Sequence, residues 1–468
     1  MQVRVDENPT AAVLSGPAAV QAVSYAPQAP AGPEELRARR DLRQFAGICL
    51  QLTLLLVVCY VYKVHSGAFL YTMAYAVGVF VVHYFTPVRL KKSVFVCGSL
   101  VAGALIVAHP FPEVSPSRYH YVGAFGTVGV GALILALVVF LIMRSRVAYG
   151  LRVTGLLGIA GVLTLARAEI GEFSVMPDAY WGVIGSLFMF RLILYAHEVR
   201  FAKKPESLGD TLSYFLLLPN YCFLLFPVVD YATFKKSYLS DDIHRTAQRG
   251  VAWMTRGVVQ LLVYRFLYHR VVVGEADVNS FVTLLRYLFT PYLLYTNISG
   301  QFHIIVGMLH LFGYKLPETN RRYLLADSFT DFWRRINIYW KDFMVKVFYY
   351  PAYFRLRKKN ETLAISVATA VVFVATTVLH GWQWFWIQGS FKVSQADLVF
   401  WTALGVLVWI TVLREMRRGA SRSGRAEGWT AGRVLRVLGV YVTISLLWSI
   451  WSSESIADWL DTITYWSA

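Results

Sequence analysis

Two polar residues in the C-terminal half of the chain are the strongest candidates for chemistry. His380 ends an apolar run that begins near Thr362, and Asn337 precedes it by 43 residues. A neutral imidazole can take a proton from a hydroxyl group near pH 7. An amide side chain does not titrate, but it can orient a substrate or donate to a developing oxyanion. The two residue types therefore predict proton transfer by His380, assisted by Asn337.

The surroundings of His380 indicate a membrane setting. The run from Thr362 to Leu379 contains no charged residue, so it predicts a helix that enters a bilayer. An ionisable side chain in such a place is costly and is a candidate for function. The aromatic residues that follow, Trp382, Trp384, Phe385 and Trp386, predict either the wall of a pocket or an interface belt.

The segment around Asn337 has the pattern of an amphipathic helix. At 100° per residue, one face of residues 332–347 is apolar and the opposite face is mostly basic. The apolar face holds Phe332, Trp333, Ile336, Trp340, Phe343 and Val347, and the other holds Arg334, Arg335, Lys341, Asp342 and Lys346. Such a helix lies in the membrane interface, with Asn337 at the border of its two faces.

The composition places these segments in a polytopic membrane protein. The chain has 468 residues, of which 56% are hydrophobic and 16% charged, whereas soluble domains carry about 25% charged residues. Apolar runs lie at 45–64, 68–86, 93–109, 123–143, 150–166, 178–198, 250–272, 279–298, 302–313, 397–413 and 434–451. With the span that leads to His380, we expect an all-α protein of roughly eleven or twelve membrane segments, including re-entrant and interfacial helices.

The basic residues set the expected orientation. They cluster before the first apolar run and after the second, fourth and sixth, whereas the loops at 109–121 and 166–178 are poor in Lys and Arg. The positive-inside rule therefore predicts a cytoplasmic N-terminus. The net charge of +17 is explained by lipid headgroups and topology, without a nucleic-acid partner.

The chain divides simply. Residues 1–33 are rich in Ala, Pro, Val and Gln and predict a disordered tail, and residues 34–468 predict a single transmembrane domain. The apolar segment at 211–229 is broken by Pro219 and Asn220, which is typical of a re-entrant or kinked segment. The four cysteines lie in apolar segments without metal-ligand spacing, so they predict neither a disulfide nor a metal site.

Three segments in a fixed order resemble a known family. They are HIIVGMLHLFGYKLPETNRRYLLADS, FTDFWRRINIYWKDFMVKVFYYP and a hydrophobic helix ending in LHGWQWFWIQG. This order is similar to the membrane-bound O-acyltransferases (the MBOAT superfamily). It most resembles the bacterial branch with alginate O-acetyltransferase and the D-alanyl transfer protein of teichoic acids. The resemblance covers about 290–390, and the broken segment at 210–234 also looks like the family's. It implies an MBOAT-like core over about 205–415.

The resemblance implies roles for particular residues. His380 matches the family's near-invariant histidine, and Asn337 falls where members carry Asn, His or Asp. Weaker substrate-binding candidates are Trp333, Arg334, Arg335, Trp340, Lys341, His303 and Trp382. Alginate-type members usually have His at the position of Asn337, and many bacterial members have Tyr-Ser-Asp where this chain has Gln301-Phe302-His303. The first departure argues against an alginate-like substrate, and the second is a further difference from many bacterial members.

The implied reaction moves an acyl group, such as acetyl, from acyl-CoA or another acyl thioester to a hydroxyl group. No permanently bound cofactor or metal is expected. The acceptor would be a glycan, a lipid or another molecule, with membrane lipids and accessory surface or periplasmic proteins as partners. The expected location is the bacterial cytoplasmic (inner) membrane.

Other interpretations stay open at this point. His380 could be an ordinary helix-end histidine, Asn337 an interfacial polar residue, and His303 a core residue. A different class of function is a non-catalytic transporter or exporter component, which usually has several charges within its spans. Arg191 and Arg265 are the plainest such charges here, and neither has an acidic partner nearby in the sequence.

Overall fold

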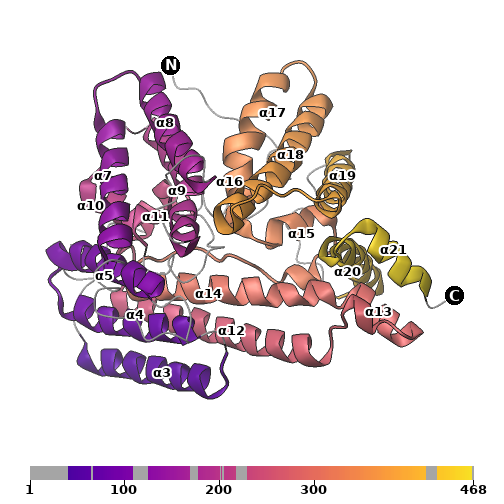
Figure 1. Ribbon diagram of the computed structural model, residues 1–468, viewed down its shortest axis with the longest axis horizontal. Coiled ribbons are helices and arrows are strands. Elements are labelled where there is room, and N and C mark those ends of the chain that lie inside the picture. The colour runs from indigo at the N-terminus through magenta and orange to yellow at the C-terminus, as the bar shows by residue number, and fades with distance from the viewer. Residues whose placement is uncertain are drawn as a thin grey trace.

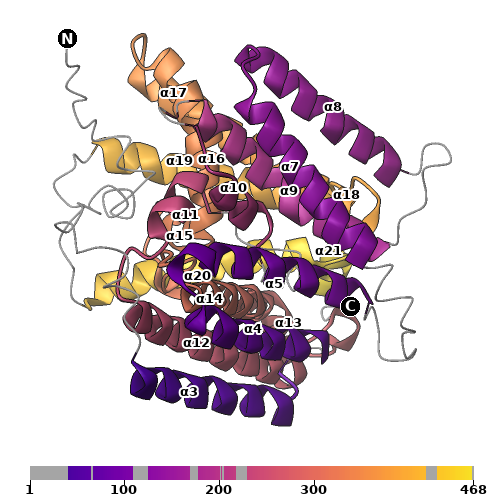
Figure 2. The same cartoon turned by 90° about the vertical axis from the view of Figure 1, so that its left-hand side faces the viewer.

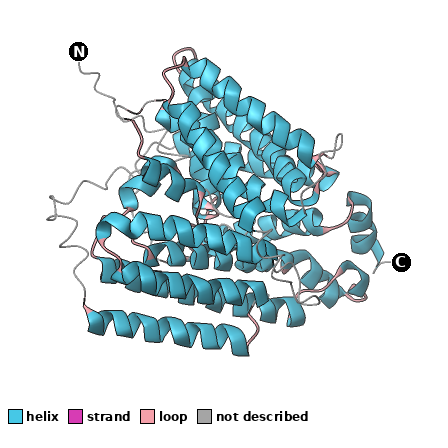
Figure 3. Cartoon of the chain, turned by 60° about the vertical axis from the view of Figure 1, so that its left-hand side comes forward, coloured by secondary structure: helices cyan, strands magenta, loops and turns pink. Residues whose placement is uncertain are grey.

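The computed structural model of the chain describes residues 41–64, 67–108, 125–168, 178–200, 202, 205–217, 229–417 and 429–465. Within these ranges the regular structure is helical, and no strand is present (Figure 3). The all-α prediction is thus confirmed. The tail expected at 1–33 and the break at Pro219 and Asn220 lie outside the described residues.

Five of the described helices are long and apolar enough to cross a membrane. They are α3 (Leu42–Val61), α8 (Tyr149–Arg167), α18 (Glu361–Gln388), α19 (Gln395–Arg417) and α20 (Ala431–Ser452). A spanning helix needs about 20 predominantly apolar residues, and these five meet that requirement. The multi-pass membrane character is therefore supported, whereas the expected eleven or twelve segments remain a prediction.

The remaining described α-helices outside the candidate site are found in both halves of the chain. Before the middle of the chain they are α4 (Gly67–Phe85), α5 (Val88–Ala108), α7 (Gly131–Arg144), α9 (Asp178–Val199), α10 (Leu208–Phe215) and α11 (Tyr231–Ser237). After it come α12 (Ile243–Arg270), α13 (Phe281–Phe289), α14 (Tyr295–Leu311), α17 (Tyr350–Leu356) and α21 (Ile456–Tyr465). In Figure 1, α3, α4, α12 and α14 lie horizontally, and α7, α8, α9, α17 and α18 rise steeply above them.

The run expected at 279–298 is wrong as a single span. The structure has α13 up to Phe289, a short 3-10 turn at Pro291–Leu294, and then α14. Pro291 has no backbone N–H to continue the hydrogen bonds of the helix, so α13 ends just before it. The separate run expected at 302–313 belongs to α14.

Helices α12 and α14 pack closely through four glycines, which we call the glycine seam. The seam pairs Gly250 with Gly307 and Gly257 with Gly300 in antiparallel register. A Cβ atom placed on Gly257 would lie 2.5 Å from the carbonyl oxygen of Gly300, and one on Gly250 would lie 2.6 Å from that of Gly307. Only glycine permits this approach of two backbones, which is typical of helix pairs in membranes.

Buried arginine side chains stabilise helix ends in this fold. Arg191 of α9 is 1% exposed, and it donates hydrogen bonds of 3.2 Å to the carbonyls of Tyr214 and Phe215 at the end of α10. These carbonyls have no partner within their own helix, and a cation near them also complements the helix dipole. Arg191 therefore satisfies the backbone where α10 stops inside an apolar segment.

Other basic residues act on helix ends in the same way. Arg167 donates to carbonyls near the end of α18, Arg265 to the end of α3, Arg286 to the end of α12 and Arg152 to the end of α7. The sequence shows no acidic partner near Arg191 or Arg265. In the structure both side chains bind backbone carbonyls. Part of the positive charge of this chain is used to hold its helices together.

Two basic turns lie at the same end of the molecule. The α7–α8 turn carries Arg144 and Arg146, and the α17–α18 turn carries a basic segment at 355–359. Figures 1 and 2 both place these two turns together at the top of the structure. This arrangement agrees with the expectation that both turns face the same side of the membrane.

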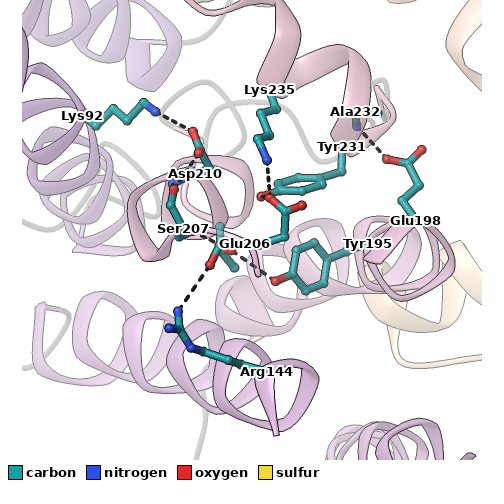
Figure 4. Close-up of polar contacts among 11 residues, drawn as sticks. Lys92, Arg144, Tyr195, Glu198, Glu206, Ser207, Asp210, Tyr231, Ala232 and Lys235 are labelled. Atoms are coloured by element: carbon teal, nitrogen blue, oxygen red, sulfur yellow. Dashed lines mark hydrogen bonds and ion pairs between the residues drawn. The ribbon is translucent and has the colours of Figure 1, made fainter. Parts of the chain in front are cut away.

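A charged corner forms where α5, α9, α10 and α11 meet (Figure 4). Lys92 pairs with Asp210 at 2.5 Å, and Lys235 pairs with Glu206 at 2.5 Å. Tyr231 donates a hydrogen bond of 2.8 Å to the same Glu206 carboxylate. The two lysines of this corner are therefore matched by acids within α10 and just before it.

Candidate functional site

The amphipathic helix expected over 332–347 is wrong as one continuous helix. The structure has α15 (Phe329–Arg335) and α16 (Ile338–Met344), with Asn337 in a left-handed conformation between them (φ 38°). This conformation cannot continue an α-helix, and asparagine is among the few residues that tolerate it. A π-helical turn (Val345–Tyr349) then extends α16. Lys341, expected on the polar face, is 1% exposed.

Contacts with the preceding loop hold this break in place. The backbone N–H of Arg321 donates to the carbonyl of Arg335, and that of Ile338 donates to the carbonyl of Thr319. The buried side chain of Asn320 accepts a hydrogen bond of 2.8 Å from the backbone N–H of Asn337. Hydrogen bonds from a segment distant in sequence thus replace those of a continuous helix.

Asn337 caps the helix that follows it. Its side-chain oxygen accepts a 3.3 Å hydrogen bond from the backbone N–H of Trp340. An N-cap of this kind satisfies one of the first free N–H groups of a helix. The cap fixes the start of α16 and, with it, the position of the Trp340 side chain.

His380 lies within α18, although the sequence placed it at the end of a helix. Its Nδ1 is 2.9 Å from the carbonyl oxygen of Thr376. Because a carbonyl can only accept, the neutral ring carries its proton on Nδ1 and has a free lone pair on Nε2. Among the residues that the structure describes, Nε2 has no hydrogen-bond partner.

Two tryptophans contact the imidazole of His380. The Trp340 ring of α16 meets it edge to face with ring centroids 5.2 Å apart, and the Trp401 ring of α19 lies 4.6 Å away. Asn337 is therefore linked to His380 through Trp340. Its side chain caps the backbone N–H of Trp340, and the ring of Trp340 contacts the imidazole. The structure brings three of the predicted residues together and adds Trp401, which the sequence did not suggest.

The three basic candidates next to Asn337 are paired with acids. Arg334 meets Glu415 of α19 at 3.4 Å and Arg335 meets Asp331 at 2.7 Å. Lys341 forms an ion pair with Asp342. These pairs indicate roles in packing and charge balance around α15 and α16.

The predicted aromatic candidates lie in different surroundings. Trp333 is buried against Phe373, with ring centroids 4.9 Å apart. Trp382 stacks on Phe385 at 5.3 Å and meets Trp386 edge to face. Trp386 in turn packs on Trp181 of α9. Trp382 is two residues from His380 and projects in a different direction from the α18 axis.

His303 belongs to a separate polar cluster between α12 and α14. It is fully buried, its Nδ1 is 2.6 Å from the side-chain oxygen of Gln260, and it stacks on Trp253. Gln260 also donates a hydrogen bond to Ser299. None of these described partners contacts His380, so His303 is a core residue of the α12–α14 pair in this structure.

Sequence reasoning missed Trp401 and Asn320, which position the site from other segments. Trp401 lies 21 residues after His380 in an apolar run, and Asn320 lies in the loop before α15. Neither stands out by spacing or charge. Only the packing of α19 on α18 and of the loop on α16 gives them a role.

Comparisons with known proteins do not identify the chain. No protein-family model matches it, and no curated protein is significantly similar to it. The resemblance of the three segments to membrane-bound O-acyltransferases therefore stays a prediction, and the function is argued from the site.

Proposed function

We propose that this protein is a membrane-embedded O-acyltransferase that moves an acyl group from a thioester to a hydroxyl group. The observation that carries the proposal is the state of His380. Its Nδ1 proton is held by a backbone carbonyl, its Nε2 lone pair has no partner among the described residues, and two indole rings enclose it. This is the arrangement that a general base requires.

The reaction follows from this geometry. Nε2 of His380 takes the proton of the acceptor hydroxyl while the hydroxyl oxygen attacks the thioester carbonyl carbon. The carbonyl electrons move onto its oxygen, and they return as the carbon–sulfur bond breaks. The imidazolium then gives its proton to the departing thiolate, so the products are an ester and a free thiol, and His380 is regenerated.

The finer parts of the proposal rest on the sequence resemblance. They are acyl-CoA as donor, a glycan or lipid hydroxyl as acceptor, an MBOAT-like core of eleven or twelve segments, and accessory surface or periplasmic proteins. Placement in the bacterial inner membrane, with a cytoplasmic N-terminus, follows from the same resemblance and from the basic loops.

The ion pairs around α15 and α16 favour one basic segment as the place for donor phosphates. The four basic side chains of 334–346 have acidic partners: Arg334, Arg335, Lys341 and Lys346. Arg355, Arg357, Lys358 and Lys359 are exposed and have no ion-pair partner among the described residues. We therefore assign the attraction of donor phosphates to the α17–α18 turn, which would also meet anionic lipid.

The transporter alternative gains no support from the charges within the apolar segments. Few such charges are present in the sequence, and the plainest two, Arg191 and Arg265, bind backbone carbonyls at helix ends. Stabilising these helix ends gives both charges a role that needs no transport path.

An assay with labelled donors tests the proposed function directly. Membranes that contain the full-length protein are incubated with radiolabelled acetyl-CoA or palmitoyl-CoA. Transfer of label to lipid, glycan or protein, above that of membranes without the protein, is the expected result. Equal labelling of both membranes with both donors would contradict the proposal.

Substitutions of Asn337 separate its two possible roles. Asn337→Ala removes the cap and strains the left-handed backbone, so we expect acyl transfer to fall about 10- to 1000-fold, the range for loss of one oriented group. Asn337→Asp retains a capping oxygen but loses the amide N–H donors. Near-normal activity of Asn337→Asp would identify a cap, whereas a loss equal to that of alanine would identify a donor to the substrate. Normal activity of Asn337→Ala would exclude both roles.

The orientation of α18 can be tested with single cysteines in a background without the four native ones. Lys358 lies just before α18 and Gln388 is its last residue, and both are exposed. The 28 residues of α18 span about 42 Å at 1.5 Å per residue. We expect a membrane-impermeant thiol reagent added from the outside to modify Gln388→Cys and not Lys358→Cys. The reverse pattern would invert the proposed topology. Gly381 is unsuitable, because a Cβ there would lie 2.6 Å from Val393.

A further inference from the structure

We propose that the indole N–H groups of Trp340 and Trp401 form the oxyanion hole of this enzyme. This inference rests on the proposed function and adds two donors for the thioester carbonyl oxygen. From the sequence alone, Trp340 was a weak substrate-binding candidate, Trp401 was not a candidate, and Asn337 was the expected donor.

The two indoles flank the same imidazole. Their ring centroids lie 5.2 Å and 4.6 Å from that of His380. They come from α16 and α19, which are separate in sequence. A carbonyl whose carbon is attacked by a hydroxyl at His380 Nε2 would thus have N–H donors nearby on two elements.

Both N–H groups are buried and have no hydrogen-bond partner in the described part of the chain. Leaving a buried donor unpaired costs about 1–3 kcal/mol, and native structures contain few such groups. Two of them around one functional histidine indicate that a ligand acceptor completes them.

Other tryptophans of the chain show the usual arrangement. The N–H of Trp409 donates to Ser366, that of Trp451 to Asp397 and that of Trp459 to Ser449. Trp386 also has an unpaired N–H, but its ring packs on Trp181 and on its own helix neighbours. Among these tryptophans, Trp340 and Trp401 combine an unpaired indole N–H with a ring contact to His380.

The position of Asn337 supports assigning the donors to tryptophan. Its side-chain oxygen is engaged with the backbone N–H of Trp340. Asn337 thereby fixes the helix turn that carries the Trp340 indole. In this arrangement Asn337 is a positioning residue and the indole N–H groups touch the reacting carbonyl.

The test replaces each indole by phenylalanine in the full-length protein. Trp401→Phe and Trp340→Phe keep an aromatic ring against His380 and remove the N–H. We expect each to lower kcat about 10²–10³-fold, the usual cost of one oxyanion donor. The KM for acetyl-CoA should change far less, because the hydrogen bonds strengthen only as charge develops. Trp409→Phe, on the same helix as Trp401, is the matched control and should keep wild-type activity.

A spectroscopic measurement gives an independent readout. Acetyl-CoA labelled with ¹³C at its carbonyl is bound to the His380→Ala protein, which cannot turn it over. Hydrogen bonding should shift the carbonyl stretch to lower wavenumber, and adding Trp401→Phe should reverse part of the shift. Wild-type kcat in both phenylalanine variants, with an unchanged carbonyl stretch, would overturn the oxyanion assignment. If His380→Ala itself transferred acyl groups normally, the general-base role of His380 would fail instead, whereas an absence of acyl transfer by the wild-type protein would contradict the proposed function.

Discussion

Replacing His380 with alanine is expected to lower the kcat of acyl transfer about 10²–10⁴-fold, the usual cost of losing a general base. The side chain is lost from a helix interior where its ring contacts two tryptophans, so part of the packing is lost as well. The radiolabel assay with acetyl-CoA and palmitoyl-CoA, at matched protein amounts in the membrane, measures the effect.

His269→Ala is the matched control for this variant. His269 lies at the exposed end of α12, and its described ring contact is with the neighbouring Tyr268. We expect wild-type activity from it. His380→Ala at wild-type activity, with normal membrane insertion, would remove His380 from the mechanism and leave the proposed function without its base.

Replacing a glycine of the seam with a larger residue is expected to lower the stability of the folded protein more than the other substitutions proposed. The Cβ of Gly257→Ala would lie 2.5 Å from the backbone oxygen of Gly300 and 2.6 Å from the Ile304 side chain. Because a backbone oxygen cannot rotate away, α12 and α14 must separate, at a cost of about 1–3 kcal/mol for overpacking. Gly257→Leu should cost more and reduce the folded protein recovered in detergent. Thermal unfolding of the purified protein measures both.

Gly158→Leu provides the comparison within another apolar helix. Gly158 is exposed on α8, and a Cβ there would meet nothing within 4 Å. Its unfolding temperature should therefore match that of the wild type. An unchanged unfolding temperature for Gly257→Ala would show that the two helices do not approach as closely as the structure has them.

Several features of this protein were predictable because they depend on local sequence. The apolar runs indicated an all-α membrane protein. A helix satisfies its own backbone hydrogen bonds in a bilayer, so a spanning helix can be predicted from length and hydropathy. His380 stood out for a related reason, because an ionisable residue beside 18 uncharged ones is rare. The segment that contains it proved longer, since its aromatic residues continue the same helix to Gln388.

Tertiary contacts decided what the sequence left open or placed wrongly. Periodicity favoured one helix over 332–347, but hydrogen bonds from the 319–321 segment and the left-handed Asn337 divide it. The carbonyl partners of Arg191 lie on another helix. The contact of Trp401 with His380 exists only because α19 packs on α18. Local patterns thus indicated the helical class and which residue is a candidate base. The packing of distant segments decided which groups surround it, because burial and hydrogen-bond partners depend on neighbours that no local pattern specifies.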